Sequence, residues 1–152
     1  MSGFIDTCGD GFSLESRVFA GYASVFNTAD NGDDIVMPGA FTKSLKTLKR
    51  LPFLDNHNPN TPLGRIIVAE QDDYGLYVVG LKNKTARSLR IGEGLSFGYR
   101  VKGRKNSTLA SGRKLTELEI VEVSVTPTPM HQYARIDLAG LASAFLRMGL
   151  LP

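Results

Sequence analysis

From Pro52 to Thr126, this 152-residue sequence alternates short apolar segments with turn-forming residues. Gly, Pro, Asn and Asp gather between the segments. A rhythm of this kind is typical of short strands joined by turns, and it predicts a barrel or a sandwich. The expected strands are Arg17–Phe26, Pro52–Leu54, Leu63–Ala69, Gly75–Leu81, Leu95–Val101 and Lys114–Thr126.

A few helices are expected around the strands. In the first of them, Phe41, Leu45 and Leu48 recur at helical spacing. A proline stands near its start, where a missing N–H does no harm. The last is apolar and too short to span a bilayer, so we expect it to pack on the main domain or on a partner subunit. The expected helices are Pro38–Leu51, Thr85–Glu93 and Asp137–Leu150.

The length fits a single domain with a core of its own. We expect residues 1–15 to form a flexible N-terminal arm, residues 16–137 the main domain, and residues 138–152 the C-terminal apolar helix. Hydrophobic residues make up 42% of the chain and charged residues 22%, which excludes a disordered protein.

Composition also excludes several environments and ligands. No apolar run approaches the roughly 18–20 residues of a membrane helix, and the N-terminus lacks a secretory pattern. The single cysteine, Cys8, cannot form an internal disulfide, so synthesis in the cytoplasm is expected. A net charge of +3 without tryptophan argues against a dedicated nucleic-acid binder.

An acidic cluster at Asn27–Asp34 raises the question of a calcium site. Its spacing does not match the Asp-x-Asp-x-Asp-Gly order of an EF-hand loop. The segment therefore predicts a solvated turn, and no metal is expected.

The strand GLSFGYRV offers a candidate nucleophile. Alternation puts Ser96, Gly98 and Arg100 on one face, opposite a row of apolar side chains. Gly98 removes the side chain next to Ser96, so another backbone or a ligand can approach closely. Taken alone, however, an ordinary serine on a half-buried strand fits the pattern better.

The strand ELEIVEVSVT offers a candidate carboxylate. In a regular strand, Glu122 and Ser124 share the face of Leu118 and Ile120. A carboxylate among apolar residues is costly unless it is paired, and a histidine is the partner that needs one. A bulge near Val121 would instead send Glu122 to solvent.

The chain has two histidines, His57 in LDNHNPN and His131 in TPTPMHQ. Acyl transfer by a serine needs a base to remove the hydroxyl proton and a carboxylate to orient that base. The sequence contains this set of groups, but many proteins contain the same three residue types.

Four segments together resemble the prohead proteases of tailed phages, which are capsid-maturation serine peptidases related in fold to herpesvirus assemblins. The resemblance covers about Arg17 to Asp137. It implies a mainly β fold with flanking helices, an assemblin-like closed β-barrel surrounded by a few helices. The four segments are GYASVFNTADNGDDIVMPGAF, LPFLDNHNPNTPLGRI, LSFGYRV and LTELEIVEVSVTPTP.

The resemblance also implies the site. The family's histidine corresponds to His57, its serine to Ser96 and its third member to Glu122, which predicts a Ser-His-Glu triad; His131 is given no role. Arg100 and Gly98 are candidates for oxyanion or cleft support. The stretch from Gly75 to Ser96 is short for the family, and Phe97 stands where isoleucine is typical.

The implied function is that of an endopeptidase that cleaves the scaffolding region of the major capsid protein, and itself, in the host cytoplasm inside the assembling prohead. No metal or organic cofactor is expected, and a homodimer or higher homo-oligomer is. The main alternative is a non-catalytic scaffold or capsid-interior protein on the same barrel. A weaker alternative is a small basic barrel that binds nucleic acid.

Overall fold

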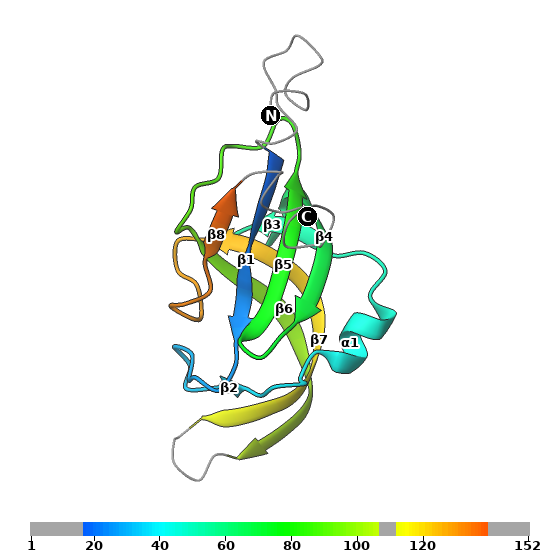
Figure 1. Cartoon of the computed structure of the whole chain (residues 1–152), viewed down its shortest axis with the longest axis vertical. Helices are drawn as coiled ribbons and strands as arrows, with labels where there is room; N and C mark the ends of the chain where they lie inside the picture. The colour runs from blue at the N-terminus through cyan, green and yellow to red at the C-terminus, as the bar shows by residue number, and fades with distance from the viewer. Residues whose placement is uncertain (1–16, 107–111, 140–152) are drawn as a thin grey trace, which may run out of the picture.

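The computed structural model describes residues 17–106 and 112–139, and Figure 1 shows their arrangement. Strands make up most of this part of the chain, together with one short helix. In chain order the elements are β1 (Val18–Val25), β2 (Ile35–Val36), α1 (Thr42–Thr47), β3 (Pro52–Asp55), β4 (Asn58–Gln71), β5 (Gly75–Lys82), β6 (Gly94–Asn106), β7 (Arg113–Thr126) and β8 (Ile136–Ala139). The mainly β class is therefore confirmed.

The strands form one curved sheet in the order β2-β7-β3-β4-β5-β1-β8, and β6 pairs with β7 outside this path. Most pairs are antiparallel, but β7 runs parallel to both β2 and β3. In the described part of the chain no strand pair joins β8 to β2, so the sheet is not closed. The expected closed barrel is not confirmed.

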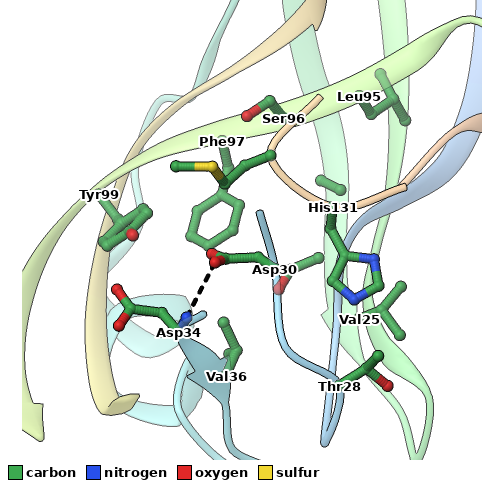
Figure 2. A pocket seen from close by; sticks show the side chains of 13 residues that line it. Val25, Thr28, Asp30, Asp34, Val36, Leu95, Ser96, Phe97, Tyr99 and His131 are labelled. Atoms are coloured by element: carbon green, nitrogen blue, oxygen red, sulfur yellow. Dashed lines mark hydrogen bonds between the residues drawn. The ribbon is translucent and has the colours of Figure 1, made fainter. Parts of the chain in front are cut away.

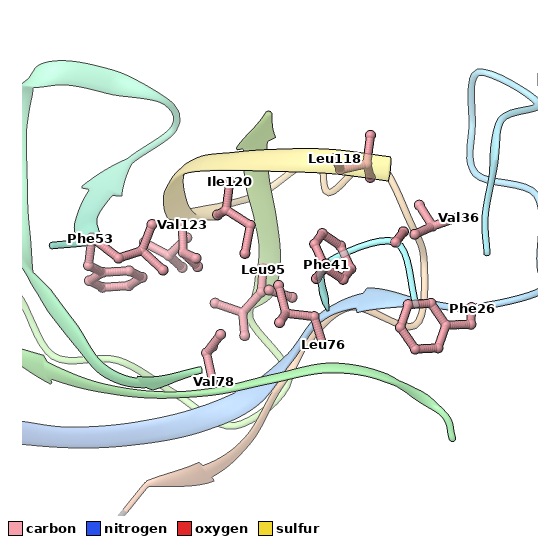
Figure 3. Close-up of a cluster of buried hydrophobic side chains, with 14 of the residues drawn as sticks. Phe26, Val36, Phe41, Phe53, Leu76, Val78, Leu95, Leu118, Ile120 and Val123 are labelled. Atoms are coloured by element: carbon pink, nitrogen blue, oxygen red, sulfur yellow. The ribbon is translucent and has the colours of Figure 1, made fainter. Parts of the chain in front are cut away.

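The core lies inside the curve of the sheet. Figure 3 shows side chains from β3, β5, β6 and β7 meeting there, together with Phe41 from the turn that precedes α1. Phe53 packs on Phe19 with ring centroids 4.3 Å apart, which joins β3 to β1. All six expected strands are confirmed, and residues of each lie in this cluster or pack against it.

The expected helices are mostly absent. The segment Pro38–Leu51 contains only the helix Thr42–Thr47, because Leu48 already has an extended backbone with ψ 117°. Thr85–Glu93 is not helical. There the Glu93 carboxylate accepts the Arg90 N–H at 2.6 Å, and such side-chain bonding competes with helix formation.

The start of the expected C-terminal helix, Asp137–Leu150, belongs instead to strand β8. This strand pairs with β1, with Leu138 opposite Ala20, and Ile136 is buried in the core. The rest of that segment and the expected N-terminal arm lie outside the described residues. No helix in the described ranges has the length and apolarity needed to cross a membrane.

Candidate active site

His57 lies at the tip of the β3–β4 hairpin. Asp55 pairs with Asn58, and the two residues between them have positive φ angles, 49° for Asn56 and 62° for His57. This is the backbone of a type I′ turn, the tight turn that suits the twist of a hairpin. Asparagine and histidine adopt such a conformation more often than most residues do, but it remains uncommon and depends on other contacts.

Strand β7 supplies those contacts. The Asn56 N–H donates to the Val125 carbonyl at 2.8 Å, and the Thr126 hydroxyl donates to the Asn56 side-chain oxygen at 2.7 Å. The His57 N–H donates to the hydroxyl of Ser124 at 3.0 Å. The turn is therefore fixed against the end of β7.

Glu122 owes its position to a bulge in β7. Gly98 of β6 pairs with Glu122 and Tyr99 pairs with Ile120, which leaves Val121 without a partner. The alternation of the strand reverses at this point, so that Glu122 and Ser124 face away from the core. The core-facing residues are Leu118 and Ile120 before the bulge, and Val123 and Val125 after it.

The bulge considered from the sequence is thus present, but its expected consequence was wrong. Glu122 is only 7% exposed, because the turn formed by Asn56 and His57, called here the histidine turn, covers it. One carboxylate oxygen, Oε1, contacts His57 Nδ1, and the other accepts a hydrogen bond from Ser124 Oγ at 2.7 Å. Both oxygens of the buried carboxylate therefore have partners.

Gly98 provides the space for this carboxylate. A Cβ atom at Gly98 would lie 2.6 Å from Oε1 of Glu122, closer than real Cβ contacts allow. The close approach expected at Gly98 is therefore made by Glu122, which faces it across the β6–β7 pair.

The contact with Glu122 also sets the acidity of the histidine. The hydrogen bond to Glu122 raises the pKa of His57 above its ordinary value of 6.5, against a smaller opposing effect of burial. Nδ1 is engaged, no described residue forms a hydrogen bond with Nε2, and the side chain remains 42% exposed. This arrangement suits a base that exchanges protons through Nε2.

Ser96 lies on the strand next to Glu122. It pairs directly with Ser124, and cross-strand partners project from the same face of a sheet, so Ser96 shares the face of Glu122 and Ser124. Ser96 is 6% exposed, and no hydrogen bond joins it to His57 in the structure. The structure thus joins two of the three predicted residues directly and puts the third on the same face.

Arg100, the other candidate for cleft support, is exposed. Its guanidinium lies 3.5 Å from the carboxylate of Glu119, which is its cross-strand partner on β7. This ion pair lies beyond the bulge, on the side away from Ser124.

A small cavity of about 30 Å³ borders the serine strand. Figure 2 shows Phe97, Tyr99 and His131 around it, with Asp30 between them. His131 is buried, accepts the Tyr133 N–H at Nδ1, and has no partner for Nε2 among the described residues. Burial lowers its pKa, and it makes no hydrogen bond to Ser96 or Glu122.

The sequence did not predict the hydrogen bonds that Asn56 and Ser124 make around the site. The Asn-His pair of a two-residue turn was available as a signal for Asn56. Ser124 was assigned to the face of Glu122, but its contact with the histidine backbone depends on the parallel pairing of β3 with β7. Within the described ranges, no three His, Cys, Asp or Glu side chains are placed to hold a metal ion.

Known proteins resemble this chain in sequence and in fold. The family model described as Caudovirus prohead serine protease matches residues 8–145. The chain belongs to this family. A curated relative, the prohead protease of Enterobacteria phage HK97, is 32% identical over 140 residues, which are 84% of this chain and 61% of the relative. The chain thus spans about three fifths of that relative's length.

Among solved structures, the KSHV protease in complex with a hexapeptide phosphonate inhibitor superimposes with a TM-score of 0.55. The two sequences are 15% identical, and the superposition covers 78% of this chain and 63% of the KSHV protease chain. The prohead protease resemblance and the herpesvirus-protease-like fold are both confirmed.

Proposed function

We propose that the chain is a serine endopeptidase in which Ser96 is the nucleophile, His57 the general base and acid, and Glu122 the carboxylate that orients the histidine. The observation that carries the proposal is the contact between Glu122 and His57 Nδ1, with Ser96 on the same face of the adjacent strand. Membership in a family of serine proteases supports it.

The chemistry follows from these positions. Ser96 Oγ attacks the scissile carbonyl carbon while Nε2 of His57 takes the hydroxyl proton. The other ring proton stays on Nδ1, hydrogen-bonded to the Glu122 carboxylate. The resulting imidazolium is stabilised by the buried carboxylate and then protonates the leaving amine. A water molecule, deprotonated by the same Nε2, then attacks the Ser96 ester. The acid product is released, and Nε2 returns the proton to Ser96 Oγ, which restores the free serine and the neutral histidine.

This mechanism requires Ser96 Oγ to come within reach of Nε2. The two groups are not hydrogen-bonded in the structure. Catalytic hydrogen bonds are often long or poorly aligned without substrate and shorten in the substrate complex. The exposed part of the His57 side chain leaves it room for such an adjustment.

We further propose that the substrate is the scaffolding region of the major capsid protein, and the chain itself, inside the assembling prohead in the host cytoplasm. The name of the HK97 relative, a prohead protease, supports this setting. Removing scaffold frees interior volume, and hydrolysis makes the step irreversible. No cofactor enters the mechanism, and a homodimer or higher homo-oligomer is the proposed state.

The test is co-expression of the chain with the major capsid protein of the same phage, read by intact mass. The wild-type chain and Ser88→Ala, a change at an exposed serine outside the site, are expected to shorten the capsid protein. Ser96→Ala should leave it whole while remaining folded by circular dichroism. Normal cleavage by Ser96→Ala would refute the nucleophile. A capsid protein left whole by the wild-type chain would favour the non-catalytic alternative.

A further inference from the structure

We propose that Ser124 is a positioning residue for catalysis, holding the Glu122 carboxylate and the His57 backbone at the same time. The inference rests on the proposed function and adds a fourth side chain to its site. Ser124 is fully buried and so does not touch substrate.

The hydroxyl of Ser124 acts both as a hydrogen-bond donor and as an acceptor within the site. It donates its single proton to Oε2 of Glu122 at 2.7 Å, and its oxygen accepts the N–H of His57 at 3.0 Å. A serine hydroxyl has one proton to donate, so this arrangement fixes its direction. Ser124 is 0% exposed, so its hydroxyl is not in contact with solvent in the structure.

Ser124 also lies where the three strands of the site meet. It pairs with Leu54 of β3, the strand that leads into the histidine turn, and with Ser96 of β6. It is two residues beyond Glu122 on β7 itself. Its main chain is therefore fixed relative to all three predicted catalytic residues.

Each of the two hydrogen bonds removes a freedom that the catalytic pair would otherwise have. The bond to Oε2 fixes the plane of the carboxylate, so that Oε1 faces His57 Nδ1. The bond from the His57 N–H holds this residue at φ 62°, in a backbone region that steric contacts disfavour for a side chain with a Cβ atom. Loss of the hydroxyl should disturb proton transfer rather than substrate binding.

The first experiment measures kcat and KM on a peptide containing the capsid cleavage site. Ser124→Ala is expected to lower kcat by about 10- to 100-fold, the range for losing hydrogen bonds to a charged group, with KM within about twofold. Ser124→Thr, which keeps a hydroxyl, should recover most of the rate.

Ser44→Ala is the matched control. Ser44 Oγ accepts the Ile120 N–H at 2.9 Å, a bond of the same kind to the same strand, but it does not contact Glu122 or His57. A Ser124→Ala variant with wild-type kcat, or with no greater loss than Ser44→Ala, would overturn the proposal.

The second experiment does not depend on activity. The titration of His57 is followed by NMR in Ser96→Ala protein, with and without Ser124→Ala. Without the hydroxyl the carboxylate is less well held against Nδ1, so the raised pKa of His57 should fall toward 6.5. An unchanged titration contradicts the proposal.

Failure of the proposed function and failure of the proposal on Ser124 give different results. If Ser96→Ala still cleaves capsid protein, the proposed function fails, while the His57 titration still decides whether Ser124 holds the pair. If Ser124→Ala does not fold, the same titration is measured in Ser124→Cys, because a thiol is similar in size to a hydroxyl but is only a weak hydrogen-bond donor. A Cys variant with the wild-type His57 pKa would likewise overturn the proposal.

Discussion

At the scale of single residues, the protonation of His57 links the geometry to a pH profile. A general base must be neutral, and Glu122 raises the pKa of His57 above 6.5. We therefore expect the acidic limb of kcat/KM against pH to lie above pH 6.5, with activity lost as the pH falls through it. Glu122→Gln should move this limb down toward 6.5 and lower kcat, while leaving residual activity because the base remains.

The measurement is kcat/KM on a capsid-site peptide from pH 5 to 9 for both proteins. A Gln variant with wild-type turnover and an unshifted acidic limb would exclude Glu122 from the site.

Gly98 gives a second residue-scale prediction. Because a Cβ atom there would meet Oε1 of Glu122 at 2.6 Å, Gly98→Ala should displace the carboxylate from His57 and lower kcat about as much as Glu122→Gln. Gly103→Ala, on the same strand, is the control, since its new methyl group would meet side-chain atoms of Thr116 and Glu117. Equal rates for the two alanine variants would show that the space at Gly98 does not serve the carboxylate.

The sequence predicts the candidate residues of the site but not the contacts between them. Ser96, His57 and Glu122 are candidates because of the resemblance and because acyl transfer needs these residue types. The direction of Glu122 depended on one unpaired residue, Val121, which alternation cannot reveal. That Ser124 contacts the His57 backbone could not be foreseen from either strand alone, because the two are 67 positions apart in the chain.

At the scale of elements, the contribution of the histidine turn to the stability of the fold can be measured independently of catalysis. Asn56 has φ 49°, and its side-chain oxygen accepts the buried Thr126 hydroxyl at 2.7 Å. Asn56→Gly keeps the backbone freedom but removes this acceptor, so we expect a loss of about 1–2 kcal/mol in the free energy of unfolding. Asn56→Val should cost more, because a β-branched residue is poorly tolerated at positive φ.

Urea unfolding at constant pH measures both variants of this turn. If Asn56→Val were as stable as Asn56→Gly, positive φ would not be a constraint at this position. Loss of activity beyond the loss of folded protein would show that the turn also positions His57.

Strands were easier to predict than helices for a physical reason. Each strand buries one face in a common core, and this pattern is visible in its own residues. The expected helix at Thr85–Glu93 had a helical start and stop, but ion pairing of Glu93 with Arg87 and its bond to the Arg90 N–H favour an irregular path. Strand β8 was missed because its partner, β1, is more than 100 residues earlier in the chain.

At the scale of the whole molecule, β7 is the strand that connects the site to the rest of the fold. Its C-terminal part pairs with β3 and β6 around Glu122 and Ser124, and its N-terminal part pairs with β2 far from the site, as Figure 1 shows. Changes near Arg113 should therefore alter stability without altering the catalytic contacts.

Asp34 and Arg113 fasten the loop before β2 to this distant end of β7. The Arg113 side chain donates to both carboxylate oxygens of Asp34, at 3.1 Å from Nε and 2.6 Å from Nη2, and its backbone N–H donates at 3.0 Å. These bonds from Arg113 lower the pKa of Asp34 below its usual 3.8. A lowered pKa in the folded state means that the carboxylate stabilises the fold above pH 3.8 and loses this effect as the pH falls through the lower value.

We therefore expect Asp34→Asn to unfold at lower urea concentration than the parent protein at pH 7, with the difference shrinking steadily below about pH 4. The exposed pair of Lys43 and Glu117 is the control, since Glu117→Gln should change stability little at any pH. A difference for Asp34→Asn that stays constant from pH 7 to pH 3 would contradict the role of ionised Asp34. Since Arg113 and Glu122 lie nine positions apart on β7, the variant should keep the wild-type kcat while folded, which separates the stability of this strand from its chemistry.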